Sequence, residues 1–233
     1  VVLGGSEDFS VWMWNANSGA CMQVFTGHSA SVTSVMFTPD GRQVITASAD
    51  ASVRVWEPKS GGCVATVQGH PFSEGGVTCM RINNEGTMLI TGSEDSKACI
   101  IALQQATAKV VGKLEGHSDS VESVDICQHM PLLAATASMD TLANIWDMGQ
   151  HQIRVSCKHP EGVTKVKFHP SLPLLLTACL DFRSRVWDIR SGNCERIVQG
   201  HAAGVQDLVP TCDGQRFISG ADDYTVRLFM IPV

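Results

Sequence analysis

The stretch that decides the fold is residues 27–68, which read GHSASVTSVMFTPDGRQVITASADASVRVWEPKSGGCVATVQ. Residues 31–37 alternate with a period of two, as a strand with two different faces does, and three further strands are expected at 43–47, 52–56 and 63–67. Turn residues separate these segments, for example Pro39 and Gly41 after the first one. The stretch therefore predicts a four-stranded antiparallel sheet.

The same unit recurs along the whole chain with a period of 41 to 45 residues. An Asp marks the turn before the third strand of each unit, at Asp8, Asp50, Asp95, Asp140, Asp181 and Asp223. Six residues later comes an aromatic residue in five of the six units, at Trp14, Trp56, Trp146, Trp187 and Phe229. The remaining unit has Ile101 there. This period and pattern predict an all-β fold, a β-propeller of four-stranded antiparallel blades.

The repeat divides the chain into six blades, at 1–26, 27–68, 69–115, 116–157, 158–199 and 200–233. The first lacks its innermost strand, the last lacks its outermost strand, and the four between them are complete. A propeller closes by borrowing a strand from the other terminus, and here neither end supplies what the other lacks. We therefore expect further sequence before Val1, as part of a seven- or eight-bladed propeller.

Composition narrows the classes of function. The formal net charge is -6, from 23 acidic and 17 basic residues, which argues against direct nucleic-acid binding and permits a basic protein or peptide partner. The nine Cys form no metal-ligand pair. We interpret them, including the repeated Cys21, Cys63 and Cys194, as small buried hydrophobes in a reducing, cytoplasmic compartment. We expect no metal, no cofactor and no membrane span, because the apolar runs are short.

The repeated polar residues predict a buried hydrogen-bond chain in which Trp donates to Thr, Thr to His and His to Asp. Three sets are complete: His28-Thr46-Asp50-Trp56, His117-Thr136-Asp140-Trp146 and His159-Thr177-Asp181-Trp187. Two others, His70-Thr91-Asp95 and His201-Ser219-Asp223, lack the Trp. A hydroxyl, a His and an Asp also compose a hydrolase triad. The set recurs five times and no GxSxG elbow is present, so we predict scaffolding and no enzyme.

With its Gly-His start and Trp end, the repeat resembles the WD-repeat family over all 233 residues. That resemblance implies that three positions in each blade project around the central channel: the residue before the turn Asp, and the two that flank the first apolar residue of the inner strand. No Lys or Arg occupies the sixteen such positions. The predicted partner-binding residues among them are Glu7, Glu94, Glu122, Met139, Leu180 and Asp222. The alternative is an ordinary solvated acidic surface.

A narrower resemblance rests on the irregular blades. The motifs are Gly75-Gly76-Val77-Thr78-Cys79, then 85–93, Ile101 in place of Trp, 109–112, and Ser120 to Val124 followed by Cys127 and Met130-Pro131-Leu132. They resemble the family of the angio-associated migratory cell protein and its fungal relative, a dedicated chaperone of a large-subunit ribosomal protein. The family has eight blades. The resemblance implies that the acidic channel face captures the basic N-terminus of a newly made ribosomal protein.

Two functions follow as expectations. The first is a non-enzymatic chaperone or escort in ribosome assembly, a monomeric propeller that acts within a larger complex. The second is a general scaffold in a signalling, cytoskeletal or ciliary complex.

Overall fold

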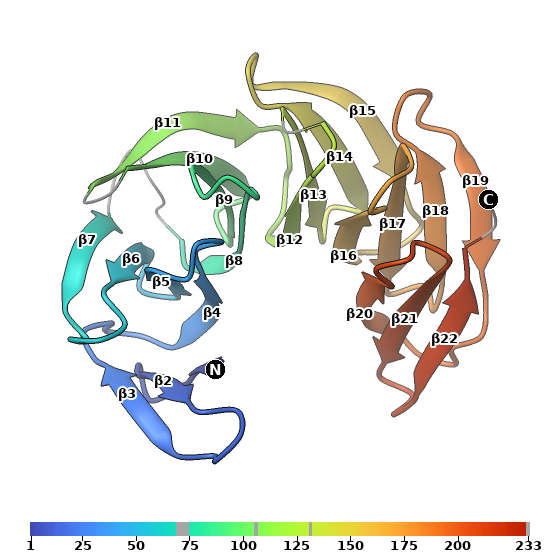
Figure 1. Ribbon diagram of the computed structural model, residues 1–233. Coiled ribbons are helices and arrows are strands. Elements are labelled where there is room, and N and C mark those ends of the chain that lie inside the picture. Colours follow the sequence, from blue (N-terminus) through green and yellow to red (C-terminus); the bar gives the residue numbers. More distant parts are fainter. Residues whose placement is uncertain (69–74, 105–106, 131, 232–233) are drawn as a thin grey trace. The chain divides into compact units, whose positions relative to one another are not determined.

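The computed structural model describes residues 1–68, 75–104, 107–130 and 132–231, which form only strands and their connections. The strands make six antiparallel sheets, each built from consecutive strands (Figure 1), so the predicted all-β blade architecture is confirmed. The chain comprises two compact units, Val1–Lys113 and Leu114–Val233. In the described ranges no helix is long and apolar enough to cross a membrane.

The first unit contains three sheets. The strands of the first sheet are β1 (Val2–Gly5), β2 (Val11–Trp14) and β3 (Cys21–Phe25). Those of the second are β4 (Val32–Phe37), β5 (Val44–Ser48), β6 (Ser52–Trp56) and β7 (Cys63–Gln68). Those of the third are β8 (Val77–Ile82), β9 (Met88–Ser93), β10 (Lys97–Gln104) and β11 (Thr107–Glu115), which ends just past the unit boundary.

The second unit also contains three sheets. The strands of its first sheet are β12 (Val121–Ile126), β13 (Leu133–Ser138), β14 (Leu142–Asp147) and β15 (Gln152–Lys158). Those of the next are β16 (Val163–Phe168), β17 (Leu174–Cys179), β18 (Ser184–Asp188) and β19 (Cys194–Val198). Those of the last are β20 (Val205–Pro210), β21 (Arg216–Ala221) and β22 (Val226–Met230).

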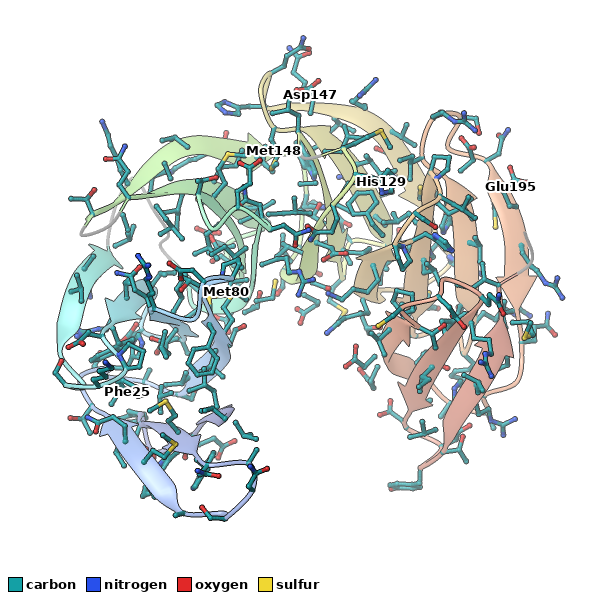
Figure 2. The ribbon with its side chains drawn as sticks, viewed as in Figure 1. Phe25, Met80, His129, Asp147, Met148 and Glu195 are labelled. Atoms are coloured by element: carbon teal, nitrogen blue, oxygen red, sulfur yellow. The ribbon has the colours of Figure 1, made fainter. Side chains whose placement is uncertain are left out.

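Consecutive sheets of a unit pack face to face, which explains the burial pattern. Every residue of β5 is buried because both faces of its sheet are covered, whereas the outer strand β7 is mostly exposed. Phe25 and Met80 belong to the two buried clusters of the first unit (Figure 2). The Trp that ends the third strand fills the space between sheets, since Trp56 packs on Phe25 with ring centroids 5.7 Å apart.

The turn that contains the repeated Asp has the same strained geometry in all six sheets. The residue after the Asp is a non-glycine residue with positive φ, at Phe9 (73°), Ala51 (58°), Ser96 (65°), Thr141 (74°), Phe182 (70°) and Tyr224 (60°). Side chains other than Gly, Asn and Asp rarely adopt this left-handed conformation. The Asp stabilises the turn in sheet after sheet by accepting hydrogen bonds from the strand that follows, as Asp50 does from the amide of Ser52 at 2.9 Å.

Candidate functional site

The hydrogen-bond chain around His28 is present. Trp56 Nε1 donates to Thr46 Oγ1 at 2.8 Å, and Thr46 Oγ1 lies 2.7 Å from His28 Nε2. His28 Nδ1 lies 2.9 Å from Asp50 Oδ2. A carboxylate only accepts, so Nδ1 carries the proton and Nε2 accepts from the Thr hydroxyl. Burial would raise the pKa of Asp50, but hydrogen bonds from Ser52, the Ser29 amide and His28 lower it to about 2.

The sheet that begins with β12 repeats this geometry. His117 lies 2.8 Å from Asp140 Oδ2 and 2.7 Å from Thr136 Oγ1, and Trp146 Nε1 donates to Thr136 at 2.8 Å. The amide of Ser118 donates to the same carboxylate oxygen at 3.0 Å. Burial lowers the pKa of His117 although Asp140 favours the protonated ring. The ring is therefore neutral at pH 7, as the chain of hydrogen bonds requires.

The third set departs from the prediction. Thr177 lies between His159 Nε2 at 2.8 Å and Trp187 Nε1 at 3.0 Å, but the predicted bond from His159 to Asp181 does not form. Instead, His159 Nδ1 donates to the carbonyl of Cys157 at 3.0 Å, and Arg185 donates to both oxygens of Asp181.

The cause is the residue after the His. After His28, His117 and His201 this residue gives its amide proton to the turn Asp, as Ala202 does to Asp223 at 2.9 Å. Pro160 occupies this position after His159 and has no amide proton, so Asp181 loses that donor. Burial and the Arg185 charge then lower the pKa of His159 to about 4.

Of the two sets that lack Trp, the one around His201 has the predicted hydrogen bonds. His201 lies 3.0 Å from Asp223 and 2.8 Å from Ser219, and its ring packs edge-on against Phe229, which replaces Trp. The set that begins with His70 lies partly outside the described residues. In the complete sets the hydroxyl-bearing residues Thr46, Thr136 and Thr177 are all 0% exposed, so no substrate can reach them. Among the described residues no cluster of His, Cys, Asp or Glu is arranged to hold a metal ion.

The repeated cysteines require a correction. Cys21, Cys63 and Cys194 begin the outer strands β3, β7 and β19, but all three are exposed and not buried. Each thiol donates to the backbone carbonyl of the residue two positions further along its own strand, as Cys63 Sγ does to Ala65 at 3.4 Å. Outer strands have a free edge, so this position stays open to solvent.

In each sheet that has an inner strand, the predicted channel-face positions lie next to one another. The amide of the residue before the turn Asp donates to the carbonyl of the residue before the inner strand, for example from Leu180 to Gly162 at 3.0 Å and from Asp222 to Gly204 at 2.9 Å. A β-bulge follows the first residue of β4, β8, β12, β16 and β20. The bulged residues are Thr33, Thr78, Glu122, Thr164 and Gln206, and a bulge re-aims its side chain.

In the second unit three of the predicted residues lie in a continuous row. A Cβ on Gly162 would lie 2.6 Å from Met139 Sδ and 3.4 Å from Leu180 Cδ1. A Cβ on Gly204 would lie 2.9 Å from Leu180 Cδ2 and 3.2 Å from Asp222 Oδ2. The two glycines thus allow Met139, Leu180 and Asp222 to follow one another closely. Met139 and Leu180 are partly buried by this packing, whereas the sequence predicted them exposed.

The carboxylates near this row differ in exposure and in the partners that they have. Asp222 is exposed and accepts from Gln206 Nε2 at 2.7 Å, while Glu122 is partly buried and accepts from Ser120 Oγ at 2.5 Å. The inner strand β16 supplies two bases that the sequence analysis missed. Lys165 pairs with Asp207 at 3.0 Å, and Lys167 pairs with Asp125 at 3.3 Å. Asp207 is therefore already neutralised, and Asp222 is the unneutralised carboxylate of the row.

Two exposed aromatic residues of the second unit escaped the sequence analysis. Phe182 and Tyr224 are 48% and 101% exposed and lie directly after the turn Asp, two residues beyond Leu180 and Asp222. The signal that could have found them is an aromatic side chain at a position that requires positive φ. In the first unit, the two remaining predicted residues, Glu7 and Glu94, are both exposed.

Comparison with known proteins agrees with this architecture. The family model for the WD domain, G-beta repeat, matches residues 19–57, 61–101, 108–147, 151–188 and 192–229. The angio-associated migratory cell protein of Homo sapiens is 28% identical over 99% of this chain and 56% of its own length. A WD repeat-containing protein of Schizosaccharomyces pombe is 32% identical over 91% of this chain and 55% of its own length.

The nuclear distribution protein PAC1 of Arthroderma otae is 34% identical over 52% of this chain and 28% of its own length. The chain spans about half the length of the first two relatives. Since five repeat matches cover most of the sequence and the sheets have the predicted form, the chain belongs to the WD-repeat family of β-propeller proteins.

Proposed function

We propose that the row formed by Met139, Leu180 and Asp222 is a docking surface for a Lys/Arg-rich segment of a partner protein. WD repeats form protein-interaction scaffolds and are generally not catalytic, and this row is where the second unit offers both apolar and acidic groups. The observation that supports the proposal is the pair of glycines, Gly162 and Gly204, which keep the row free of intervening side chains. A segment lying along it would contact the Met139 and Leu180 side chains and the carboxylate of Asp222, which has no cationic partner.

The aromatic residues extend this surface. Phe182 and Tyr224 present ring faces to solvent beside the row, and a guanidinium or ammonium group is attracted to such faces. Asp222 and Glu122 would steer a basic segment toward the surface, so the association rate should fall as salt is added. The apolar contacts should instead control how slowly the segment leaves.

For the partner, we propose the basic N-terminus of a newly made ribosomal protein, held by this chain as an escort in the cytoplasm. Support comes from the resemblance of the irregular blades described above and from the similarity to the angio-associated migratory cell protein over almost the whole chain. The exposed thiols of Cys21, Cys63 and Cys194 fit a reducing compartment. A general scaffold is the second candidate, and the partial similarity to the nuclear distribution protein PAC1 favours it.

The test measures the affinity of fluorescein-labelled N-terminal peptides of large-subunit ribosomal proteins for the full-length protein by anisotropy at two salt concentrations. Reversal of Glu122 and Asp222 to Lys should weaken binding by tenfold or more and flatten its salt dependence. The matched control is Glu195→Lys, which reverses an exposed charge on the outer strand β19. Equal affinities of the double variant and the control would reject the proposed surface. A pull-down that yields cytoskeletal proteins and no ribosomal protein would favour the scaffold.

A further inference from the structure

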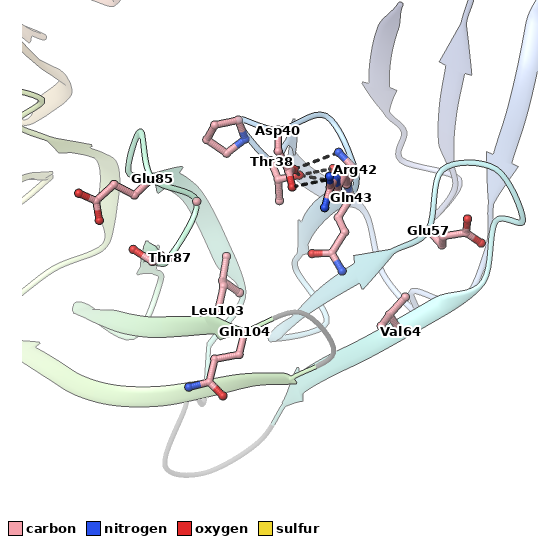
Figure 3. Close-up of a pocket in the computed structure, with 12 residues that line it drawn as sticks. Thr38, Asp40, Arg42, Gln43, Glu57, Val64, Glu85, Thr87, Leu103 and Gln104 are labelled. Carbon is pink, nitrogen blue, oxygen red and sulfur yellow. Dashed lines mark hydrogen bonds and ion pairs between the residues drawn. The ribbon is translucent and has the colours of Figure 1, made fainter.

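A groove of about 760 Å³ lies within the first unit, where the sheet of β4–β7 faces the sheet of β8–β11 (Figure 3). It is bordered by the β4–β5 turn, which contains Pro39 and Asp40, and by the β8–β9 turn, which contains Glu85. These turns lie at the opposite ends of β5 and β9 from the Asp turns. The groove is therefore separate from the channel-face positions.

The floor of the groove includes β10, the strand in which the repeat has lost its Trp. In the neighbouring sheet Trp56 fills the space against the preceding sheet and packs on Phe25. The corresponding residue of β10 is Ile101, which is 0% exposed and packs in one cluster with Ile45 and Val55. Isoleucine is much smaller than tryptophan and fills less of the space. Leu103 lies two residues further on the same face of β10, is only partly buried, and lines the groove.

The lining has an apolar floor with an acidic group at each end. Figure 3 shows Leu103 and Val64 between Glu85 on one side and Glu57 on the other. Val64 is 39% exposed, so its side chain can contact a ligand in the groove. Asp40 also lines the groove, but it accepts hydrogen bonds from Thr38 and the Arg42 amide. The Arg42 guanidinium lies 3.7 Å from the same carboxylate. Glu57 accepts a hydrogen bond from the neutral Ser60 hydroxyl, which leaves its charge uncompensated, so Glu57 and Glu85 can attract a cation.

We propose that this groove is a second docking site, for an extended segment of a partner protein in which an apolar residue is flanked on both sides by basic residues. The apolar side chain would cover Leu103 and Val64, and the two cations would face Glu57 and Glu85. The amide of the exposed lining residue Gln104 is suited to hydrogen-bond a peptide backbone. Charge complementarity selects this occupant, because the carboxylates repel phosphate-bearing ligands such as nucleic acids.

The experiment uses fluorescein-labelled peptides with the pattern Lys-Xaa-Leu-Xaa-Lys, with Xaa spacers of one to three Gly or Ser residues, and the full chain. We expect binding that is lost when both Lys are replaced by Glu or the Leu by Ser. The protein variants Leu103→Arg and Glu57→Lys should each weaken binding at least fivefold. Val64→Arg changes a more exposed side chain and tests the floor should Leu103→Arg fail to fold. Val111→Arg, on the exposed outer strand β11, is the matched control and should bind like the parent.

A further control separates this site from the channel face. Glu94→Lys reverses an exposed channel-face charge of the same unit and should leave the affinity for these peptides unchanged. If Glu94→Lys abolishes binding while Leu103→Arg and Glu57→Lys do not, the peptides bind the channel face and the groove proposal is wrong. It is equally wrong if no peptide of the series binds.

Discussion

Replacement of Asp140 by Ala tests whether the repeated polar sets hold the fold together. The Asp140 side chain is 4% exposed and accepts hydrogen bonds from His117 Nδ1, the Ser118 amide and the Leu142 amide. Ser118 is exposed, so its amide can bind water instead, but the His117 side chain is 1% exposed and its Nδ1 proton would lose its partner. One stranded buried donor costs about 1–3 kcal/mol, which is the expected loss in the free energy of unfolding.

The assay is urea unfolding at pH 7, followed by the intrinsic fluorescence of the five Trp residues, one of which is Trp146 of the same sheet. Asp8→Ala is the control, because Asp8 occupies the equivalent turn, is exposed and has no His partner. The control should change the unfolding midpoint only slightly. If Asp140→Ala and Asp8→Ala have the same midpoint, the buried chain of hydrogen bonds contributes nothing measurable and our account of the repeat is wrong.

Three further outcomes are expected. Folding lowers the pKa of His159 from 6.5 to about 4, so as the pH falls the unfolded chain takes up a proton before the folded chain does. About 3 kcal/mol of the free energy of unfolding should therefore be lost as the pH falls from 6.5 to 4. His159→Gln should flatten that part of a pH series of unfolding midpoints. Arg185→Ala should lower the free energy of unfolding, measured with urea, by about 3–5 kcal/mol, because it leaves the buried carboxylate of Asp181 without its cation. The double variant Arg185→Ala, Asp181→Ala should recover part of that loss. Tyr224→Gly should leave the melting temperature unchanged or higher, since the left-handed conformation costs an L-residue about 1–2 kcal/mol, yet weaken binding of basic peptides; unchanged binding would remove Tyr224 from the proposed surface.

Much of the fold was predictable because the repeat is strict where the backbone demands it. The residue after each turn Asp has a positive φ and the Asp holds the turn, so the Asp positions alone fix where the third strand begins. The strands expected in residues 27–68 agree with β4–β7 to within a residue or two at each end. Two complete polar sets have the predicted bonds because their loops contain the same donors.

The rest depends on interactions between sheets, which a repeat does not encode. The pair of Lys165 with Asp207 joins two inner strands, and only their packing brings the two side chains together. The groove likewise needs two sheets in contact, although Ile101 marks the place. Pro160 is a different case, since a missing amide proton is visible in the sequence and predicts the loss of a donor to Asp181. The prediction failed because the set was matched by residue type without counting backbone donors.

The departures from the repeat are also where the molecule offers groups to a partner. A residue that recurs in every sheet makes the same hydrogen bonds or packing contacts in each sheet, so its side chain is not available to a partner. Pro160 and Arg185 change the donors to Asp181, which lies between Leu180 and Phe182, and the strand with Ile101 in place of Trp lines the groove in the first unit. If function resides at such departures, restoring the repeat should remove binding and leave the fold intact. Pro160→Ser is the direct case: it should return to Asp181 the amide donor that Asp50, Asp140 and Asp223 have, and a variant that folds and still binds basic peptides like the parent would refute this link.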